Sequence, residues 1–366
     1  MSTAVSKPKM TSKFAGTKGL TVFVGMSGGV DSSLTAALLL EQGYDVVGVY
    51  MKNWTQDIPG FECPWREDYQ DAKRVAVNLG IDFRVFDFEK QYKQKVVDYM
   101  INEYKAGRTP NPDIMCNQEV KFKLFLDLAL KNGADLIATG HYARTKEGKL
   151  FKAVDENKDQ TYFLYRVSET ALLKTLFPIG EFKNKEQVRK EAQKRGLDTA
   201  SKKDSQGICF VGKVGIREFL SQYIETSPGA IKDQNGVEVG QHDGAIFYTV
   251  GQRHGLNVGG GLPFYVTGKD MKKNEVYVTT DLNGSGLWSK DMELTDVHWI
   301  NTKPALKSSN LHIRTRHRAP LVKVTLLKLE GAKLKVSLKD EIRALTPGQS
   351  AVIYDGEYVL GGGIVV

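Results

Sequence analysis

Short apolar runs alternate with longer amphipathic helical patterns from Leu20 to about Tyr142, and this alternation constrains the fold more than any other feature of the chain. We expect strands at 20–24, 44–51, 82–86 and 135–139, and helices at 30–42, 66–79, 90–105 and 120–131. Strand–helix order at this spacing is typical of a parallel sheet with helices on both faces. The pattern predicts an α/β domain with a doubly wound parallel sheet, which binds ligands at the carboxyl ends of its strands.

The sequence changes character twice after this segment. A largely helical stretch is expected over 160–224, with a helix at 185–195 that Asn184 caps and Gly196 ends. Beyond Ser227-Pro228-Gly229, Asn-Gly, Asp-Gly and triple-glycine turns separate short β-branched runs, which predicts a small β-rich central domain. Alternating apolar runs predict a C-terminal β-barrel, with strands at 322–327, 334–338, 350–354 and 358–366. The predicted domains are a basic N-terminal arm at 1–19, a catalytic domain with a helical insertion at 20–225, the central domain at 226–285 and the barrel at 286–366.

Composition narrows the class of protein. The formal net charge of +8 suits a polyanionic partner, although part of that charge sits in the arm. No apolar run approaches the roughly 20 residues that span a membrane, and the first residues lack the apolar core of a secretory signal. The 3 cysteines and 6 histidines are scattered, so neither a disulfide scaffold nor a zinc site is expected. These features indicate a cytoplasmic protein without membrane contact.

The most specific local pattern is the run Gly25-Met26-Ser27-Gly28-Gly29-Val30-Asp31-Ser32-Ser33, between the first strand and the first helix. Its glycines let backbone N–H groups approach one anion, and the helix N-terminus adds partial positive charge. Asp31 is placed to hold Mg²⁺ bridging the phosphates. Such a run is also compatible with an ordinary glycine turn, and it is neither a Walker A loop nor a G-x-G-x-x-G fingerprint. It resembles the PP-loop of the ATP pyrophosphatase superfamily, whose members cleave ATP between the α- and β-phosphates and usually adenylate an oxygen.

Two cysteines lie in settings that favour a reactive thiolate. Cys116 precedes the helix expected at 120–131, and Asp113 is placed to accept a proton from its thiol. Cys209 follows a pair of lysines, whose charge lowers the pKa of a nearby thiol. Either cysteine is equally compatible with a buried structural role, and a structural disulfide between them is the further alternative. Cys63 has no comparable setting, and we interpret it as structural or incidental.

Several motifs in a fixed order make the chain similar to the bacterial tRNA-specific 2-thiouridylase (MnmA) family, from Leu20 to the C-terminus. The motifs are the PP-loop, Tyr50–Trp54, Asn111–Asp113, the two cysteine motifs, Gly140–Ala143, Lys158–Gln160, Thr249–Arg253 and Thr346–Gln349. This combination is far more specific than the PP-loop alone. One departure is visible, because Thr315 stands between two arginines where the family usually has tyrosine.

The resemblance implies a function and a set of site residues. ATP would bind to Gly25, Met26, Ser27, Gly28, Gly29, Val30, Asp31, Ser32, Met51 and Gly140. tRNA would contact Asn111, Pro112, Asp113, His141, Lys158, Asp159, Gln160, Arg314, Thr315 and Gln349. Cys209 would carry sulfur as a persulfide from a cysteine desulfurase or a relay protein, and Cys116 would be the nucleophile. The two cysteines would form a transient disulfide. The implied substrates are the tRNAs for lysine, glutamine and glutamate, at the wobble uridine.

Two other functions are compatible with parts of this pattern. A PP-loop amidotransferase or synthetase acting on a small metabolite would share the ATP site, but it would not need two reactive cysteines or a basic β-domain. A non-catalytic RNA-binding protein with a decayed nucleotide fold would show damage in the PP-loop, and Ser27–Ser33 show none. The sequence therefore favours an ATP-dependent sulfurtransferase that acts on tRNA.

Overall fold

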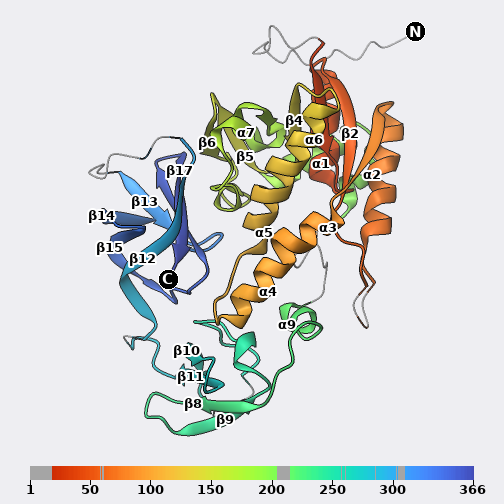
Figure 1. The fold of residues 1–366 in the computed structure, drawn as a ribbon. Helices are drawn as coiled ribbons and strands as arrows, with labels where there is room; N and C mark the ends of the chain where they lie inside the picture. Colours follow the sequence, from red (N-terminus) through yellow and green to blue (C-terminus); the bar gives the residue numbers. More distant parts are fainter. Residues whose placement is uncertain are drawn as a thin grey trace.

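Three β-sheets organise the part of the chain that the computed structural model describes, and each draws mainly on a different third of the sequence (Figure 1). The described residues are 19–57, 59, 62–203, 215–256, 258–259, 261–284, 286–301, 303 and 310–366. Most of the predicted N-terminal arm and the segment containing Cys209 lie outside them.

The first sheet is parallel and has the strand order β3-β2-β1-β4-β7. Its strands are β1 (Thr21–Gly25), β2 (Asp45–Lys52), β3 (Asp82–Asp87), β4 (Leu136–Thr139) and β7 (Thr175–Leu176). The first four confirm the predicted strands. The fifth corrects the expectation of a helical stretch over 160–224, because β7 pairs with β4 inside that stretch.

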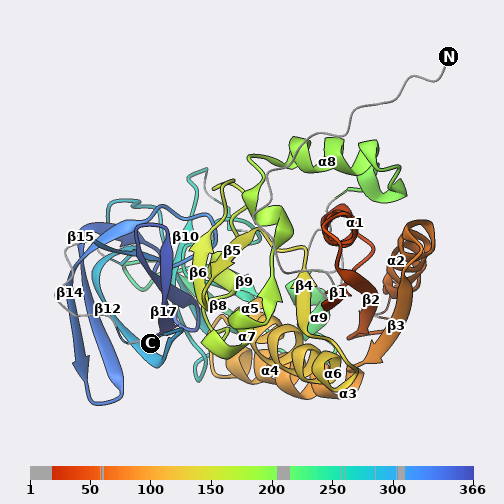
Figure 2. The same ribbon diagram turned by 90° about the horizontal axis from the view of Figure 1, so that it is seen from above.

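Helices cover both faces of this sheet, as predicted (Figure 2). Val22 and Val24 point from β1 into a core shared with α1 (Val30–Glu41), α2 (Trp65–Leu79) and α8 (Lys185–Lys194). Phe23 points to the opposite core, because side chains alternate along a strand. That second core packs against two helical runs: α3 (Glu89–Tyr92), η1 (Lys93–Val97) and α4 (Asp98–Lys105), then α5 (Pro112–Met115), η2 (Cys116–Leu124) and α6 (Phe125–Lys131).

The helical run around Cys116 differs from its prediction. It begins at Pro112 rather than at 120, with Asn111 as N-cap and a π-helical turn pattern over Cys116–Leu124. Cys116 therefore lies inside the helix rather than before it. The helix predicted at 185–195 is confirmed as α8, and the Asn184 side chain caps it by accepting from the Gln187 N–H at 2.9 Å.

The rest of the stretch at 160–224 contains only short helical elements among its described residues. These are α7 (Glu169–Leu173), α9 (Ile216–Leu220), and the 3₁₀ turns Thr161–Phe163, Pro178–Glu181 and Asp198–Ser201. In the described residues, no helix is both long and apolar enough to cross a lipid bilayer.

The second and third sheets confirm the two predicted β regions. The central sheet has the order β10-β11-β8-β9 and consists of β8 (Gly229–Lys232), β9 (Glu238–His242), β10 (Tyr265–Asp270) and β11 (Glu275–Thr279). The C-terminal barrel consists of β12 (Trp288–Trp299), β13 (Leu311–Arg314), β14 (Val322–Glu330), β15 (Lys333–Arg343), β16 (Ser350–Asp355) and β17 (Tyr358–Val365). Pairing of β12 with both β15 and β17 closes the barrel around its own apolar core.

A hairpin from the first half of the chain extends the barrel sheet, which the sequence did not predict. The hairpin consists of β5 (Ala143–Lys146) and β6 (Lys149–Lys152), and β6 pairs with β17. An ion pair of 2.7 Å between Arg144 and Glu357 adds to this junction. The β5–β6 hairpin, which directly follows the parallel-sheet strand β4, and the barrel therefore share one sheet.

Candidate functional site

Two glycines, one within the PP-loop and one packed against it, have no room for a side chain. Gly28 has φ +73°, and a Cβ there would lie 2.4 Å from the carbonyl oxygen of Asp68. Gly140 follows β4 and lies against the loop, because a Cβ there would be 2.6 Å from the backbone nitrogen of Ser32. A side chain at Gly28 would force the loop away from α2, and one at Gly140 would force the loop away from the end of β4.

The N-terminus of α1 is left open by the protein. Gly29 is the N-cap and has no side chain to satisfy the first N–H groups. The hydroxyls of Ser32 and Ser33 turn back and donate to the Gly29 carbonyl, at 3.1 and 2.8 Å. Within the described residues, the N–H groups of residues 28–31 have no acceptor. A helix start of this kind is an anion site.

Asp31, in the first turn of α1, is held by two side chains that the sequence did not single out. The ammonium of Lys185 lies 2.8 Å from both carboxylate oxygens, and the Tyr142 hydroxyl donates to one of them at 2.9 Å. The Lys185 side chain is only 14% exposed. The helix α8 thus brings a lysine to a phosphate loop that contains none.

The Mg²⁺ contact predicted for Asp31 stays a prediction, and it would require Lys185 to move. Lys185 occupies both carboxylate oxygens, and a cation bound there would have to displace it. Among the described residues, no group of three or more His, Cys, Asp or Glu side chains is arranged to hold a metal ion.

Met51 lies beside the first residue of the PP-loop. It sits near the end of β2, where its Cε atom is 2.9 Å from the position that a Cβ on Gly25 would occupy. An unbranched, polarisable side chain at the edge of a phosphate loop suits contact with a flat base. This geometry fits the adenine contact that the sequence resemblance implies for Met51.

A second cluster lies at the start of the helix that carries Cys116. The Asn111 side chain caps this helix by accepting from the Asp113 N–H at 3.2 Å. Burial raises the pKa of the Asp113 carboxyl, and the positive charge of Lys121 acts in the opposite direction. Cys116 follows three residues after Asp113 and is 1% exposed. The thiol of Cys116 is therefore buried in this structure.

His141 links this cluster to the carboxyl end of β4. Its Nδ1 lies 2.7 Å from the Thr139 hydroxyl, and its Nε2 lies 3.5 Å from the Lys121 ammonium. Burial, reinforced by Lys121, lowers the pKa of His141 well below its usual value. The ring is therefore neutral, and Nε2 is the nitrogen that can accept from Lys121.

Gly140 joins the two halves of the site. It precedes His141 in the chain and contacts the backbone of Asp31 and Ser32 through space. The phosphate loop and the Asp113–His141 cluster therefore meet at the carboxyl edge of one parallel sheet, where ligands of this fold class bind.

Two residues with implied tRNA contacts are engaged in the protein core. Asp159 is 1% exposed, and its carboxylate accepts from the Ala153 N–H, from the Thr161 hydroxyl and from Arg314 at 3.4 Å. The Arg314 side chain is 11% exposed. Burial raises the pKa of Asp159, and its hydrogen bonds and Arg314 oppose this shift. This pair ties the segment after the β5–β6 hairpin to the barrel.

Gln349 and Gln160 also have partners within the protein. Gln349 donates from Nε2 to the carbonyl oxygens of Thr109 and Pro110, at 2.8 and 3.4 Å. The loop of the barrel that carries Gln349 thus holds the segment leading into Asn111. Gln160 accepts from the Tyr142 N–H at 2.9 Å. The tRNA contacts assigned to these residues stay predictions.

Thr315, Lys158 and the cysteines Cys209 and Cys63 complete the predicted residues. The Thr315 carbonyl accepts from the Tyr162 hydroxyl at 3.3 Å, and Lys158 is half-buried. Cys209 lies in the segment 204–214, outside the described residues. Cys63 is half-buried, and burial raises the pKa of its thiol, which fits the structural role expected for it.

Comparison with known proteins supplies the family. Three family descriptions match successive parts of the chain: a tRNA methyl transferase HUP domain at 20–213, a tRNA methyl transferase PRC-barrel domain at 217–280 and an aminomethyltransferase β-barrel domain at 289–365. The tRNA-specific 2-thiouridylase MnmA 2 of Geobacillus kaustophilus is 48% identical over 349 residues, which cover 94% of each chain. The tRNA-specific 2-thiouridylase MnmA of Exiguobacterium sibiricum is 48% identical over 351 residues, 94% of this chain and 93% of that protein.

The chain belongs to the tRNA-specific 2-thiouridylase (MnmA) family. The predicted family resemblance is thereby confirmed over nearly the whole chain. Among solved structures, a 4-thiouridine synthetase in complex with RNA and ATP is similar at a TM-score of 0.38 and 19% identity, covering 56% of this chain and 50% of that one. That likeness is too distant to bear on the function.

In this member of the 2-thiouridylase family, Lys185, Lys121 and Tyr142 are the site residues that sequence reasoning did not select. Lys185 and Tyr142 bind Asp31, and Lys121 lies beside His141. One signal was available for Tyr142, which lies within the Gly140–Ala143 motif. Lys185 and Lys121 come from ordinary helical patterns and carry no such signal.

Proposed function

We propose that this protein makes 2-thiouridine in tRNA, at the wobble position, with ATP and a protein-bound persulfide as co-substrates. The observation that carries the proposal is that Gly140 packs against the open phosphate loop, while the next residue, His141, lies 3.5 Å from Lys121, whose charge acts on Asp113. Family membership supports the same activity, because the relatives are named for it.

In the first step, the C2 oxygen of the uridine attacks the α-phosphorus of ATP. The bond from that phosphorus to the bridging oxygen breaks, and pyrophosphate leaves. The free N–H groups at residues 28–31 would stabilise the charge that develops on the phosphates. Lys185 would exchange its contact with Asp31 for a phosphate oxygen, which gives this loop the cation that it otherwise lacks.

In the second step, the terminal sulfur of a persulfide on Cys209 attacks C2. A carbon–sulfur bond forms, and AMP leaves with the original oxygen. The thiolate of Cys116 then attacks the Sγ atom of Cys209, so the sulfur–sulfur bond breaks and sulfur stays on the base. A Cys116–Cys209 disulfide remains, which an external dithiol must reduce. Asp113 would take the proton from the Cys116 thiol, and Lys121 would favour its ionised form.

The partners follow from this chemistry. The tRNAs for lysine, glutamine and glutamate are the proposed substrates, and a cysteine desulfurase or a relay protein is the proposed sulfur donor. Mg²⁺ would accompany ATP through its phosphates rather than through a protein cluster. A cytoplasmic location is the corresponding proposal.

The matching family descriptions carry the words methyl transferase, while the curated relatives are named for thiolation. One experiment separates the two transfers. The full-length protein is incubated with unmodified tRNA in two arms. One arm contains ATP and a persulfide donor, and the other contains S-adenosylmethionine. The tRNA is then digested, and its nucleosides are identified by mass spectrometry. We expect 2-thiouridine and one AMP per sulfur in the first arm only. Methylated uridine without sulfur incorporation would contradict the proposal.

A further inference from the structure

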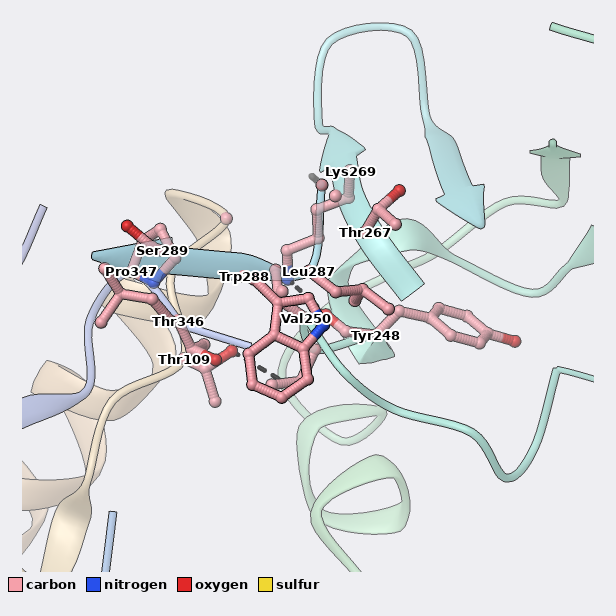
Figure 3. A pocket seen from close by; sticks show the side chains of 15 residues that line it. Thr109, Tyr248, Val250, Thr267, Lys269, Leu287, Trp288, Ser289, Thr346 and Pro347 are labelled. Carbon is pink, nitrogen blue, oxygen red and sulfur yellow. Dashed lines mark hydrogen bonds between the residues drawn. The ribbon is translucent and has the colours of Figure 1, made fainter. Parts of the chain in front are cut away.

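A cavity lies between the first part of the chain, the central domain and the C-terminal barrel, and Gly140 does not line it (Figure 3). Its volume of about 380 Å³ falls within the range of about 300–1,000 Å³ that is usual for ligand pockets. Gly107 and Thr109 line it from the segment between α4 and α5. The other lining residues belong to the central domain, to residues 286–289 at the start of β12, and to the barrel loop at 345–347. The site described above uses none of the side chains that line this cavity.

Lys269, on β10, provides a half-buried positive charge in the cavity wall. Its ammonium donates to the carbonyl oxygens of Tyr248 and Ile246, at 2.8 and 3.4 Å. Among the described residues it forms no ion pair, and burial alone lowers its pKa to about 8. An ammonium has three N–H donors, so one remains for a ligand. A buried cation without a counter-charge is costly unless an anion joins it.

Trp288, the first residue of β12, provides a flat surface in the same cavity. Its indole N–H donates to the Leu282 carbonyl at 2.6 Å, which fixes the edge of the ring, and the residue is 37% exposed. In the described part of the chain, no other ring or cation stacks on it. Figure 3 shows the indole amid the lining residues, with Thr109 and Thr346 on one side in this view and Tyr248 on the other.

Hydroxyl groups complete the lining. Thr109 and Thr249 lie with their hydroxyl oxygens 3.2 Å apart, which joins the catalytic segment to the central domain, and Thr267, Ser289 and Thr346 also line the cavity. A cation, an unstacked indole and several hydroxyls are the groups that recognise a phosphate, a base and a sugar.

We propose that this cavity binds a nucleotide, with its phosphate on Lys269 and its base against Trp288, separately from the ATP and the target uridine. The nucleotide is either free or part of the tRNA, and in the second case the inference rests on the proposed function. Thr109 stands two residues before Asn111, so an occupant would touch the segment that leads into the catalytic helix.

The test measures binding with the full-length protein and its Lys269→Met and Trp288→Leu variants, in the absence of ATP and of a sulfur donor. Lys272→Met is the matched control, because Lys272 is exposed in the turn that follows β10. The probes are unmodified tRNA over a range of salt concentrations and uridine 5′-monophosphate. Thermal unfolding checks that each variant folds. Lys269→Gln, which removes the charge but keeps N–H donors for the two carbonyl oxygens, replaces Lys269→Met where that variant does not fold.

If the cavity binds a nucleotide of the tRNA, Trp288→Leu should weaken tRNA binding about 5- to 150-fold, as expected for one lost base stack. Lys269→Met should reduce the slope of log K against log salt by about one, and Lys272→Met should leave the slope unchanged. A merely structural role for Lys269 would not change that slope. If the cavity binds a free nucleotide, uridine monophosphate should bind the parent protein and not the Lys269→Met variant. The binding of tRNA should then be the same in both proteins.

The inference is overturned when neither variant changes tRNA binding and uridine monophosphate binding is the same in all proteins. Complete absence of tRNA binding by the parent would count against the proposed function instead. Because the binding assay contains no ATP and no sulfur donor, its result does not depend on whether the protein thiolates tRNA.

Discussion

Two helix starts face the same catalytic edge, and the protein treats them in opposite ways. At α1 the N-cap is Gly29, and the neighbouring hydroxyls turn back into the loop, so the first N–H groups have no acceptor among the described residues. At α5 the N-cap is Asn111, whose side chain accepts from the Asp113 N–H. The first helix start is kept open for a phosphate, and the second is closed to fix the protein's own groups.

This difference teaches how one sheet edge can serve two kinds of chemistry. An open helix start provides electrostatic binding, which can accommodate a nucleotide and its leaving group. A capped start fixes Asp113 and Cys116 on one turn, where Asp113 is half-buried and Cys116 is buried. Substitutions at the two helix starts should therefore have different signatures.

The largest effect is expected from Cys116→Ser. We expect the rate of 2-thiouridine formation from a persulfide donor to fall about 10³-fold or more, because the sulfur–sulfur bond is no longer broken. ATP-dependent adenylation of the tRNA should persist, since the open helix start is untouched. Quantitative mass spectrometry of the digested tRNA measures both. Cys63→Ser is the matched control, and a comparable loss in that variant would contradict the assignment.

Lys185→Met tests the open helix start. Losing a charged hydrogen bond to phosphate should raise the KM for ATP about 10- to 100-fold, measured by pyrophosphate release. Lys190→Met, an exposed lysine on the same helix, should behave as the parent does. An unchanged KM in the Lys185 variant would show that this lysine serves only to pair with Asp31.

Gly29→Ser would make the first helix start resemble the second. The added Cβ meets nothing closer than the Ser27 hydroxyl at 3.7 Å, so folding is not disturbed. A serine cap should leave the free energy of unfolding within about 0.5 kcal/mol or raise it slightly. The same cap competes with the phosphate, so ATP binding by calorimetry should weaken about tenfold. Equal or tighter ATP binding would remove the contrast between the two starts.

Asn111→Ala would open the second helix start. Loss of the cap should cost about 1 kcal/mol of unfolding free energy, measured by urea denaturation. Asn111→Asp keeps an equally good cap and should retain the parent's stability. A stability loss that is equal in both variants would show that the cap is not what holds this helix start.

The smallest effect at neutral pH concerns the protonation of Asp113. Activity should fall as the pH falls through the pKa of Asp113, which burial raises above its usual value. Lys121 favours the ionised carboxylate, so Lys121→Gln should move this acid limb to higher pH. A pH profile of the single-turnover rate measures the shift. A limb that stays in place, or that moves to lower pH, would exclude Asp113 as the proton acceptor.

Much of the fold could be predicted from sequence, because it follows from local periodicity. The first four strands of the parallel sheet and the Asn184 cap of α8 are of this kind. The early start of the Cys116 helix also had a local signal, since Asn at the N-cap followed by Pro at the first helical position marks a helix start.

The parts that could not be predicted depend on contacts between distant segments. Lys185 meets Asp31 across 154 positions of sequence, and β6 pairs with a strand that follows it by about 200 residues. Local periodicity carries no information on such pairs, since they are set by the topology of the whole chain. The PP-loop could therefore be predicted from the sequence, whereas the contact of Lys185 with Asp31 could not.

The β5–β6 hairpin has a consequence for how the protein is made on the ribosome. Its partner, β17, follows it by about 200 residues, so the edge of β6 that β17 covers stays unpaired until those residues have been made. Residues 153–165, which follow the hairpin, gain part of their support from the barrel as well, through Tyr162 and Ser350. A nascent chain therefore lacks these supports for the hairpin and the segment after it until β17 emerges, and a product that stops before β17 would have an exposed sheet edge.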